Sequence, residues 1–202
     1  MKITNEDNMD LMSRYDENHF DLAIVDPPYR NSKDNDMNQW NRKTIKEGRL
    51  KNWNNKPTKE YFNELCRVSK NQIIWGANNF GLEYKGFVVW RKKSISLNFN
   101  MSMCEIASLS EGLSTISKMF EFIPQQKNRI HPTQKPIELY EFLLERYAKK
   151  GDKILDTHMG SGSIAIACHN LGFDLIACEL DEEYYQAAMK RIKQHQAQLR
   201  IL

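Results

Sequence analysis

The sequence predicts an α/β protein in which helices cover a mostly parallel sheet, and three observations support this prediction. Short apolar runs bounded by polar residues recur along the chain, and helical patterns of about ten residues or more lie between several of them. Glycines at positions 151 and 172 stand where two of these helices are expected to end. Strands that alternate with helices in this way are typical of a layered fold with parallel strands.

The individual elements follow from hydrophobic periodicity. Strands are predicted at residues 22–25, 72–75, 87–90, 106–109, 154–155 and 175–178. Helices are predicted at residues 8–15, 58–68, 137–148, 163–171 and 181–198, with Thr58 as the N-cap of the second. The polar stretch 30–59 shows neither helical nor strand periodicity. The chain contains no internal repeat or low-complexity tract.

Length and composition limit the class of protein. A chain of 202 residues with 41% hydrophobic residues suits one domain spanning 1–202 and can bury a full core. Its formal charge of +3 is only mildly basic, so any affinity for nucleic acid requires a local cluster. The four cysteines show no metal-ligand spacing, which indicates reduced thiols and no metal site. With no signal peptide and no apolar stretch of membrane length, we expect a cytoplasmic protein without a membrane partner.

The first chemical signal is the tetrapeptide Asp26-Pro27-Pro28-Tyr29, directly after the apolar run 22–25. Because proline donates no ladder hydrogen bond and fixes its own backbone angle, the strand must end there rigidly. The Asp26 carboxylate and the Pro27 carbonyl are then two acceptors beside the Tyr29 ring. Such a group suits the edge and the face of a nucleobase amino group, and an ordinary strand-ending turn is the alternative.

The second signal is a strand end followed by a small-residue turn that opens a helix. Asp156 ends the strand, and Gly160 and Gly162 lie in the turn, as at the start of a Rossmann-like unit. The next strand ends in Glu179, whose carboxylate can accept hydrogen bonds from both hydroxyls of a ribose. Since no G-x-G-x-x-G is present, an adenosine ligand without a pyrophosphate is favoured over NAD. The alternative is a tight turn, with Glu179 capping the helix that starts near residue 181.

The third signal is the sequence HPTQKP at residues 131–136, in which Pro136 precedes a predicted helix. The hydroxyl of Thr133 and the ammonium of Lys135 can together bind a ligand carboxylate, although an ordinary polar loop is the alternative. His131 is expected to pack at the helix entry and not to act in catalysis.

In this order, the three motifs resemble those of the DNA amino-methyltransferases that modify adenine N6 or cytosine N4. The order is similar to the permuted arrangement called the beta group, and the resemblance covers most of the chain, including Asp7 at the expected end of another sheet strand. It implies a Rossmann-like methyltransferase fold, with a mostly parallel twisted sheet and helices on both faces. Thr157-His158 stands where the family usually has Pro-Phe, and Ser163 where threonine is common. The role of His158 stays open between lining the cofactor pocket and filling space.

The resemblance implies S-adenosylmethionine as the cofactor and assigns roles to individual residues. Glu179 is expected at the ribose, Asp7 at the adenine amino group, Thr133 and Lys135 at the methionine end, and Asp156, Gly160 and Gly162 around the pocket, with Asp26 bordering the cofactor. Asp26 and the Pro27 carbonyl are expected to accept both N–H bonds of the target amino group, while Tyr29 stacks on the base. Pro28 keeps this strand end rigid. The target base has to be flipped out of a duplex to reach the site.

Contact with DNA is expected from the insertion 30–59, predicted to be mobile without DNA. It carries nine basic and three acidic residues, a local charge of +6, with Trp40 and Trp53 interleaved. The expected DNA-contacting residues are Arg30, Lys33, Arg42, Lys43, Lys46, Arg49 and Lys51. Residues 91–130, which include the basic run 91–93, are interpreted as a small target-recognition region. A solvated surface is the alternative for both segments.

The function predicted from these signals is adenine N6 methylation of double-stranded DNA, of the kind found in restriction-modification systems. Asp26 favours adenine, because cytosine N4 enzymes of the family often have serine at this position. The alternatives are methylation of cytosine N4 or of an RNA base, and a catalytically silent relative that binds nucleic acid. Redox chemistry with NAD is disfavoured by the missing phosphate loop. A short recognition site is expected to be read by the loops or by a homodimer partner.

Overall fold

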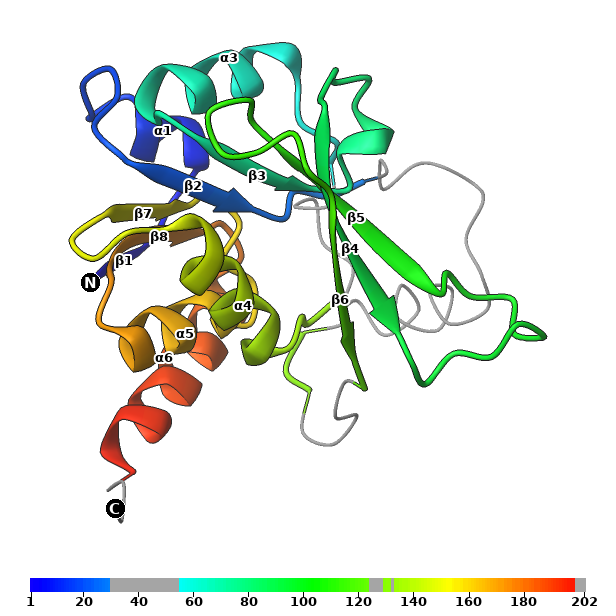
Figure 1. Cartoon of the computed structure of the whole chain (residues 1–202). Helices are drawn as coiled ribbons and strands as arrows, with labels where there is room; N and C mark the ends of the chain where they lie inside the picture. Colours follow the sequence, from blue (N-terminus) through cyan, green and yellow to red (C-terminus); the bar gives the residue numbers. More distant parts are fainter. Residues whose placement is uncertain (30–54, 124–128, 132, 199–202) are drawn as a thin grey trace.

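The computed structural model describes residues 1–29, 55–123, 129–131 and 133–198. These residues fold into one sheet flanked by helices (Figure 1). The strands are β1 (Lys2–Asn5), β2 (Leu22–Val25), β3 (Gln72–Trp75), β4 (Gly86–Lys92), β5 (Cys104–Leu109), β6 (Lys118–Phe122), β7 (Lys153–Asp156) and β8 (Asp174–Glu179). The helices are α1 (Asn8–Met12), α3 (Lys59–Val68), α4 (Ile137–Tyr147), α5 (Ser163–Leu171) and α6 (Glu182–Ala197), with a 3-10 turn η1 (Ala77–Asn79).

The strands lie in the order β1-β8-β7-β2-β3-β5-β4-β6. The first five of these run parallel, with Leu22 opposite Ile154 and Ala23 opposite Gln72. β5 is antiparallel to both β3 and β4, and β6 pairs in parallel with β4 at the far edge. The predicted Rossmann-like, mostly parallel sheet is therefore confirmed, and the carboxyl ends of its parallel strands meet at one edge.

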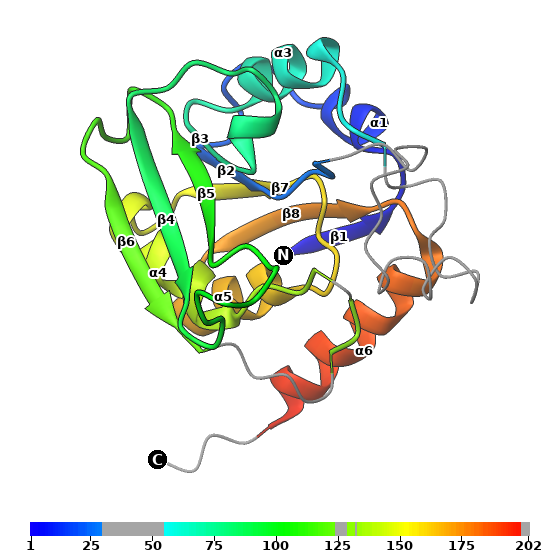
Figure 2. The same cartoon turned by 90° about the vertical axis from the view of Figure 1, so that its right-hand side faces the viewer.

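Helices cover both faces of the sheet, as predicted. α4, α5 and α6 lie on one side and α1 and α3 on the other (Figures 1 and 2). In β2, Leu22 and Ile24 belong to the core under the first group, and Ala23 and Val25 to the core under the second. Because side chains alternate along a strand, a strand buried on both faces is apolar throughout. This explains the uninterrupted apolar run that precedes Asp26.

Most predicted elements agree with the structure to within a few residues, and the differences have physical causes. The strand β6 was missed because it lies at an edge of the sheet, where Lys118, Met119 and Glu121 are exposed and no apolar run is needed. The helix predicted from residue 8 ends at Met12. Gly172 caps α5 with a φ of 75°, as expected, whereas α4 ends at Tyr147 with Ala148 as its C-cap, before Gly151 is reached.

The region 91–130 contributes to the central sheet as well as to its loops, because β5 and β6 lie within it. Its role in target recognition stays a prediction. All four cysteines are free thiols, two exposed and two buried. No helix in the described part of the chain is both long enough and apolar enough to span a membrane.

Candidate active site

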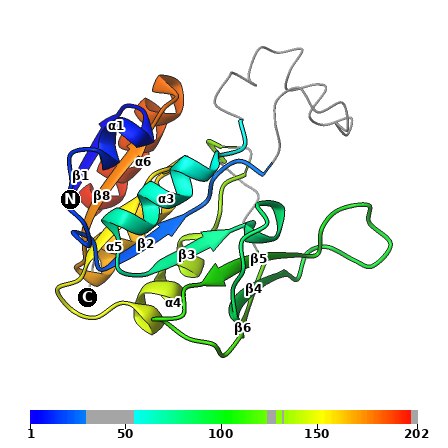
Figure 3. The same cartoon turned by 90° about the horizontal axis from the view of Figure 1, so that it is seen from above.

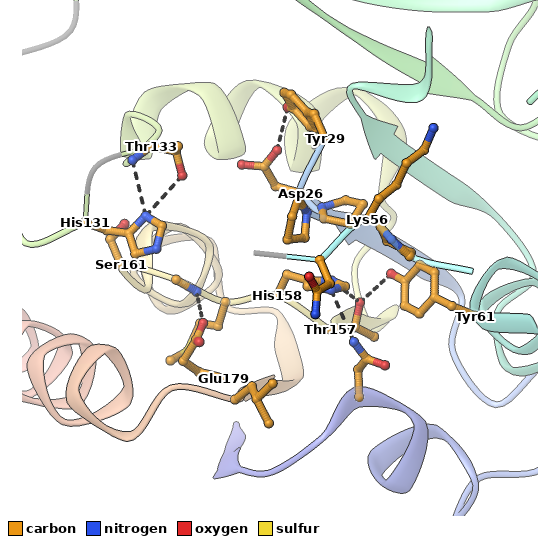
Figure 4. A pocket seen from close by; sticks show the side chains of 18 of the residues that line it. Asp26, Tyr29, Lys56, Tyr61, His131, Thr133, Thr157, His158, Ser161 and Glu179 are labelled. Carbon is orange, nitrogen blue, oxygen red and sulfur yellow. Dashed lines mark hydrogen bonds between the residues drawn. The ribbon is translucent and has the colours of Figure 1, made fainter. Parts of the chain in front are cut away.

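A cavity of about 470 Å³ opens at the carboxyl ends of the parallel strands. Its walls come from the residues that follow β1, β2, β7 and β8, from the start of β5, and from the segment that leads into α4 (Figure 4). In an open α/β sheet, ligands bind at this edge. The volume falls within the range of roughly 300–1,000 Å³ that is usual for small-molecule sites.

The Asp26 carboxylate lies at the end of β2, where two side chains hold it. The Tyr29 hydroxyl donates to Oδ1 at 2.7 Å (Figure 4), and the Lys135 ammonium forms an ion pair with Oδ2. Burial raises the pKa of Asp26 above its ordinary value, and the charge of Lys135 opposes this rise. All four residues of the predicted catalytic tetrapeptide, Asp26, Pro27, Pro28 and Tyr29, line the cavity.

The Tyr29 ring packs against the backbone of Gly76, a residue that the sequence analysis did not single out. Gly76 follows β3 with a φ of +66°, and a Cβ at this position would lie 2.1 Å from the Tyr29 ring. The ring of Phe80 meets Tyr29 edge-on, with the ring centres 6.2 Å apart. Any side chain at position 76 would therefore displace the ring from Asp26. The feature of the sequence that could have pointed to Gly76 was its place directly after a predicted buried strand.

The Glu179 carboxylate at the end of β8 holds the glycine turn. Its Oε2 accepts a hydrogen bond from the Gly160 amide at 2.8 Å, and its Oε1 accepts one from the Asp181 amide at 3.0 Å. Burial raises the pKa of Glu179, and these amide bonds oppose the rise. The cap of α6 is Asp181, whose carboxylate accepts from the amides of Glu183 and Tyr184. Glu179 thus lines the cavity instead of capping α6.

Gly162 and Asp156 support the turn without lining the cavity. Gly162 precedes α5 with a φ of +73°, and a Cβ there would lie 2.9 Å from the Ile192 side chain of α6. Asp156 is 2% exposed, and its Oδ1 accepts a hydrogen bond from the His158 amide at 2.9 Å. Burial raises the pKa of Asp156 to about 8. Both residues therefore lie behind the cavity wall, and their expected role in shaping the cofactor pocket stays a prediction.

His131 supports Thr133 before α4 and packs against α6, a more distant helix than the one at whose entry it was expected to pack. Its Nδ1 accepts hydrogen bonds from the Thr133 amide at 3.3 Å and from the Thr133 hydroxyl at 3.1 Å (Figure 4). Its ring lies 4.4 Å from that of Tyr184. Burial lowers the pKa of His131 to about 4, so the imidazole is neutral at neutral pH. The effect of this arrangement is to hold Thr133 at the cavity wall.

Lys135 connects the glycine turn with the strand end that carries Asp26. Its carbonyl oxygen accepts a hydrogen bond from the Ser163 hydroxyl at 2.7 Å, at the start of α5. Its ammonium pairs with Asp26 and, at 3.1 Å, with Glu105 of β5. The expected contact between Lys135 and a ligand carboxylate stays a prediction. Sequence reasoning missed Glu105, which stands in the strand that follows a stretch without regular structure.

Asp7 and His158 line the cavity on the side of β1. The Asp7 carboxylate caps α1 by accepting from the Met9 amide at 2.7 Å. The side-chain amide of Asn8 donates to Nε2 of His158 at 3.2 Å, and His158 Nδ1 lies 2.9 Å from the Thr157 hydroxyl. Burial lowers the pKa of His158 to about 3, so this ring is neutral as well.

Thr157 continues this chain of hydrogen bonds to Tyr61 of α3, whose hydroxyl lies 2.6 Å away (Figure 4). The polar pair Thr157-His158 therefore links α1 to α3 across the cavity wall. This gives a structural reason for two polar residues where the family usually has Pro-Phe. The sequence alone left His158 open because all its partners except Thr157 are distant in the chain.

The seven expected DNA-contacting residues, from Arg30 to Lys51, lie outside the described residues. Of the same insertion, residues 55–58 line the cavity. In the basic run 91–93, Arg91 and Lys93 pair with Glu121 at 2.8 and 3.0 Å, and Lys92 pairs with Glu105. These acidic neighbours reduce the net positive charge of the run. The connection between β4 and β5 extends beyond the ends of the parallel strands (Figure 3). A role in DNA binding stays a prediction for both segments.

The fold and the site define an α/β protein with a small-molecule cavity at the carboxyl ends of its parallel strands, beside a strand end that carries an aspartate and a tyrosine. A family model described as DNA methylase, of the N6 and N4 type, matches residues 20–190. This is most of the chain, and the chain therefore belongs to the N6/N4 DNA methylase family.

Individual relatives agree with this assignment. The Type II methyltransferase M.HpaI of Haemophilus parainfluenzae is 39% identical over 67 residues, which cover 33% of this chain and only 21% of that relative's length. The M1.HpyAVI-SAM complex shares the fold with a TM-score of 0.64 and 20% identity, covering 95% of this chain and 98% of that one. The PvuII DNA methyltransferase, described as cytosine-N4-specific, has a TM-score of 0.64 at 12% identity, covering 96% and 90%.

Proposed function

We propose that this protein transfers a methyl group from S-adenosylmethionine to the N6 amino group of adenine in DNA. The observation that supports the proposal is that a single cavity is lined by the strand end Asp26-Pro27-Pro28-Tyr29, by the Glu179 carboxylate and by residues of the glycine turn. Membership of the DNA methylase family supports the chemistry and the substrate class. The choice of adenine rests on the residues of the strand end.

The residues around the glycine turn fit the cofactor. Each Glu179 oxygen accepts one amide hydrogen bond and has a further lone pair, so the carboxylate can also accept from the two ribose hydroxyls. Asp7 has a second oxygen that is proposed to accept from the adenine amino group, and Thr133 and Lys135, which line the same cavity, are proposed to hold the methionine end. Gly160 lets a ligand approach the backbone. When bound, S-adenosylmethionine supplies a methyl group that the sulfonium has already activated.

The protein has to align the target and make its nitrogen nucleophilic. An exocyclic amino group is a poor nucleophile because its lone pair is delocalised into the ring. If Asp26 and the Pro27 carbonyl accept its two N–H bonds, the nitrogen moves toward a tetrahedral geometry and its lone pair turns to the methyl donor. Asp26 also stabilises the positive charge that develops there. Tyr29 stacks on the base, a contact worth about 1–3 kcal/mol, and the base enters by leaving the duplex.

Cytosine N4 is the second candidate target, since the PvuII enzyme of the same fold is described as cytosine-N4-specific. Asp26 favours adenine, because the cytosine enzymes that the motif resembles often have serine at this position. Basic residues of the insertion 30–59 are proposed to contact the DNA backbone, and a homodimer partner is one way to complete a short recognition site.

The nature of the modified nucleoside tests the proposal. The protein is incubated with labelled S-adenosylmethionine and a mixture of DNA and RNA, and the labelled nucleoside is then identified. We expect N6-methyladenine in DNA. N4-methylcytosine would establish the second candidate, and label in RNA would reassign the substrate. Cofactor binding without any labelled nucleoside would indicate a catalytically silent relative.

Replacement of Asp26 tests the assigned chemistry. Asp26→Asn is expected to abolish methyl transfer while cofactor affinity, measured by calorimetry, changes little, because Asp26 is assigned mainly to the target amino group. Asp21→Asn, at the other end of β2, is the matched control and should leave turnover unchanged. Turnover of Asp26→Asn within about tenfold of the wild type, or roughly 1.4 kcal/mol of barrier, would contradict the assignment.

A further inference from the structure

Five side chains form a charged cluster beside the cavity, and the proposed chemistry uses only part of it. We call Asp26, Tyr29, Lys92, Glu105 and Lys135 the Lys135 cluster. Lys135 pairs with Asp26 and Glu105, and Glu105 also pairs with Lys92. The Tyr29 hydroxyl lies 2.7 Å from Asp26, 3.5 Å from Glu105 and 3.4 Å from the Lys135 ammonium.

The place of Glu105 in the sheet makes a carboxylate unexpected. Along β5, residues 105, 107 and 109 point to the same face, and Ala107 and Leu109 belong to the buried core under α4, α5 and α6. The neighbour opposite Glu105 on β4 is Trp90, which belongs to the same core. Packing alone would favour an apolar residue at position 105. A carboxylate there costs desolvation energy unless charged partners compensate it.

The Lys135 cluster supplies these charged partners, with as many ammonium groups as carboxylates. Two carboxylates, Asp26 and Glu105, meet two ammonium groups, Lys92 and Lys135, and the Lys135 side chain is 3% exposed. The Lys135 ammonium also lies 5.2 Å from the centre of the Trp75 ring and 5.8 Å from that of Tyr29. Its position is therefore fixed between two carboxylates and two aromatic rings.

We propose that Glu105 is a positioning residue for methyl transfer, an inference that rests on the proposed function. Glu105 holds the Lys135 ammonium at a point shared by two carboxylates. The positive charge of Lys135 is then only partly spent on Asp26, whose carboxylate keeps lone pairs that accept the target amino group. Without Glu105, the ammonium, which already contacts Asp26, no longer shares its charge between these two carboxylates. It would then neutralise the charge that helps the nitrogen react and compete with the target for the same oxygen.

The pH dependence of turnover should report this arrangement. The titratable groups that act on Asp26 or sense its charge are Tyr29 beside it, Glu105 of β5, Lys135 before α4, Tyr140 of α4 and Asp156 of β7. Burial would raise the pKa of Glu105, but the ammonium groups of Lys135 and Lys92 outweigh burial and lower it to about 2. Glu105 is therefore charged throughout the working range, and its charge raises the pKa of Asp26.

The test compares Glu105→Gln with the wild type. Since Gln carries no charge, the pKa of Asp26 should fall, and the acid limb of the pH profile of kcat should move to lower pH. We expect kcat at neutral pH to fall by about tenfold while KM for the cofactor stays unchanged. Glu105→Asp should restore part of the rate. Glu111→Gln is the matched control, because Glu111 follows the same strand but is exposed and pairs with Lys85 at the surface.

A second variant predicts the opposite shift. Lys92→Met removes a positive charge from the far side of Glu105, so the pKa of Asp26 should rise and the acid limb should move to higher pH. This variant also decides the matter if Glu105→Gln does not fold, as judged by circular dichroism. A kcat of Glu105→Gln within about twofold of the wild type, with an unmoved acid limb, would overturn the proposal. An unmoved acid limb in Lys92→Met would overturn it too.

A readout without turnover separates this inference from the proposed function. Carboxyl carbon NMR follows the titration of Asp26 in the wild type and in both variants, with Asp26→Asn to assign the signal. We expect the Asp26 titration to move to lower pH in Glu105→Gln and to higher pH in Lys92→Met. Unmoved titrations would refute the role of Glu105. A wild type that methylates no nucleic acid, but shows both shifts, would instead refute the proposed function.

Discussion

At the scale of single residues, the carboxylate of Glu179 binds backbone amides and also forms part of the cavity wall. Its two oxygens accept from the amides of Gly160 and Asp181, and the same group lines the cavity. Only a carboxylate can accept two amide bonds and still offer further lone pairs to two hydroxyls. Glu179 therefore ties the glycine turn to the end of β8, and under the proposed function it also accepts from the ribose.

Glu179→Gln is expected to weaken cofactor binding by about 1.5–3 kcal/mol, the usual size of a lost hydrogen bond to a charged group. The amide keeps one acceptor oxygen and replaces the other by a donor, which opposes an N–H group of the turn. Calorimetry with S-adenosylmethionine measures the effect. Glu182→Gln, in the exposed first turn of α6, is the control. Equal affinities of Glu179→Gln and the wild type would remove Glu179 from the ligand site.

Single residues could be predicted where their role depends on their neighbours in the chain. Asp26 and Glu179 each end a recognisable strand, and the structure brings both to one cavity. Glu105 and Gly76 could not be predicted in this way, because their partners come from β2, β4 and the segment before α4. The antiparallel insertion of β5 between β3 and β4 creates these contacts, and no local pattern encodes it.

At the scale of elements, the turn from β3 into η1 sets the position of the Tyr29 ring. Gly76 leaves β3 with its amide bonded to the Ile106 carbonyl of β5 at 2.8 Å, so the turn is fixed to the sheet. The ring of Tyr29 occupies the space that a side chain at position 76 would fill. The geometry of the strand end that carries Asp26 and Tyr29 therefore depends on the neighbouring strand.

A pair of glycine variants can isolate this effect. Gly76 and Gly81 have nearly the same φ, +66° and +67°, but a Cβ at Gly81 meets no atom within 4 Å. Alanine at either position brings a similar backbone strain of about 1–2 kcal/mol. Only Gly76→Ala should also displace Tyr29 from Asp26 and lower kcat, by about tenfold or more. Steady-state kinetics and thermal unfolding of both variants measure this, and equal losses of kcat would contradict it.

Elements were predictable where burial imposed a pattern. β2, apolar throughout because both its faces are covered, was predicted with its observed bounds. The edge strands β1 and β6 were not predicted from periodicity, since half-exposed strands need no continuous apolar run. For β1, the match of Asp7 to the family's acidic position already implied a strand before it.

At the scale of the whole molecule, several buried acidic side chains lie together at the C-terminal ends of the parallel strands. Asp26, Asp156 and Glu179 all have a raised pKa, with burial as the first cause in each case. Such groups bind protons more strongly in the folded chain than in the unfolded chain, and this costs stability as the pH rises. Functional sites commonly carry a cost of this kind.

Asp156 allows this cost to be measured. Its pKa is about 8 in the fold, against about 3.9 in an unfolded chain. Between these values the folded state holds a proton that the unfolded state has lost, so the free energy of unfolding falls as the pH rises from about 4 to 8. Asparagine is neutral throughout and keeps an acceptor for the His158 amide. Asp156→Asn should therefore gain stability over the wild type by up to roughly 1.4 kcal/mol per pH unit across this window.

Urea unfolding of wild type and Asp156→Asn at pH 5, 6.5 and 8 tests this expectation. Asp21→Asn is the control, because the Lys70 ion pair lowers the pKa of Asp21, and the stability that this carboxylate provides is lost only as the pH falls through that low value. Its difference from the wild type should stay constant from pH 5 to 8. A constant difference for Asp156→Asn as well would mean that Asp156 is already ionised in the fold at pH 5, and that its burial carries no pH-dependent cost.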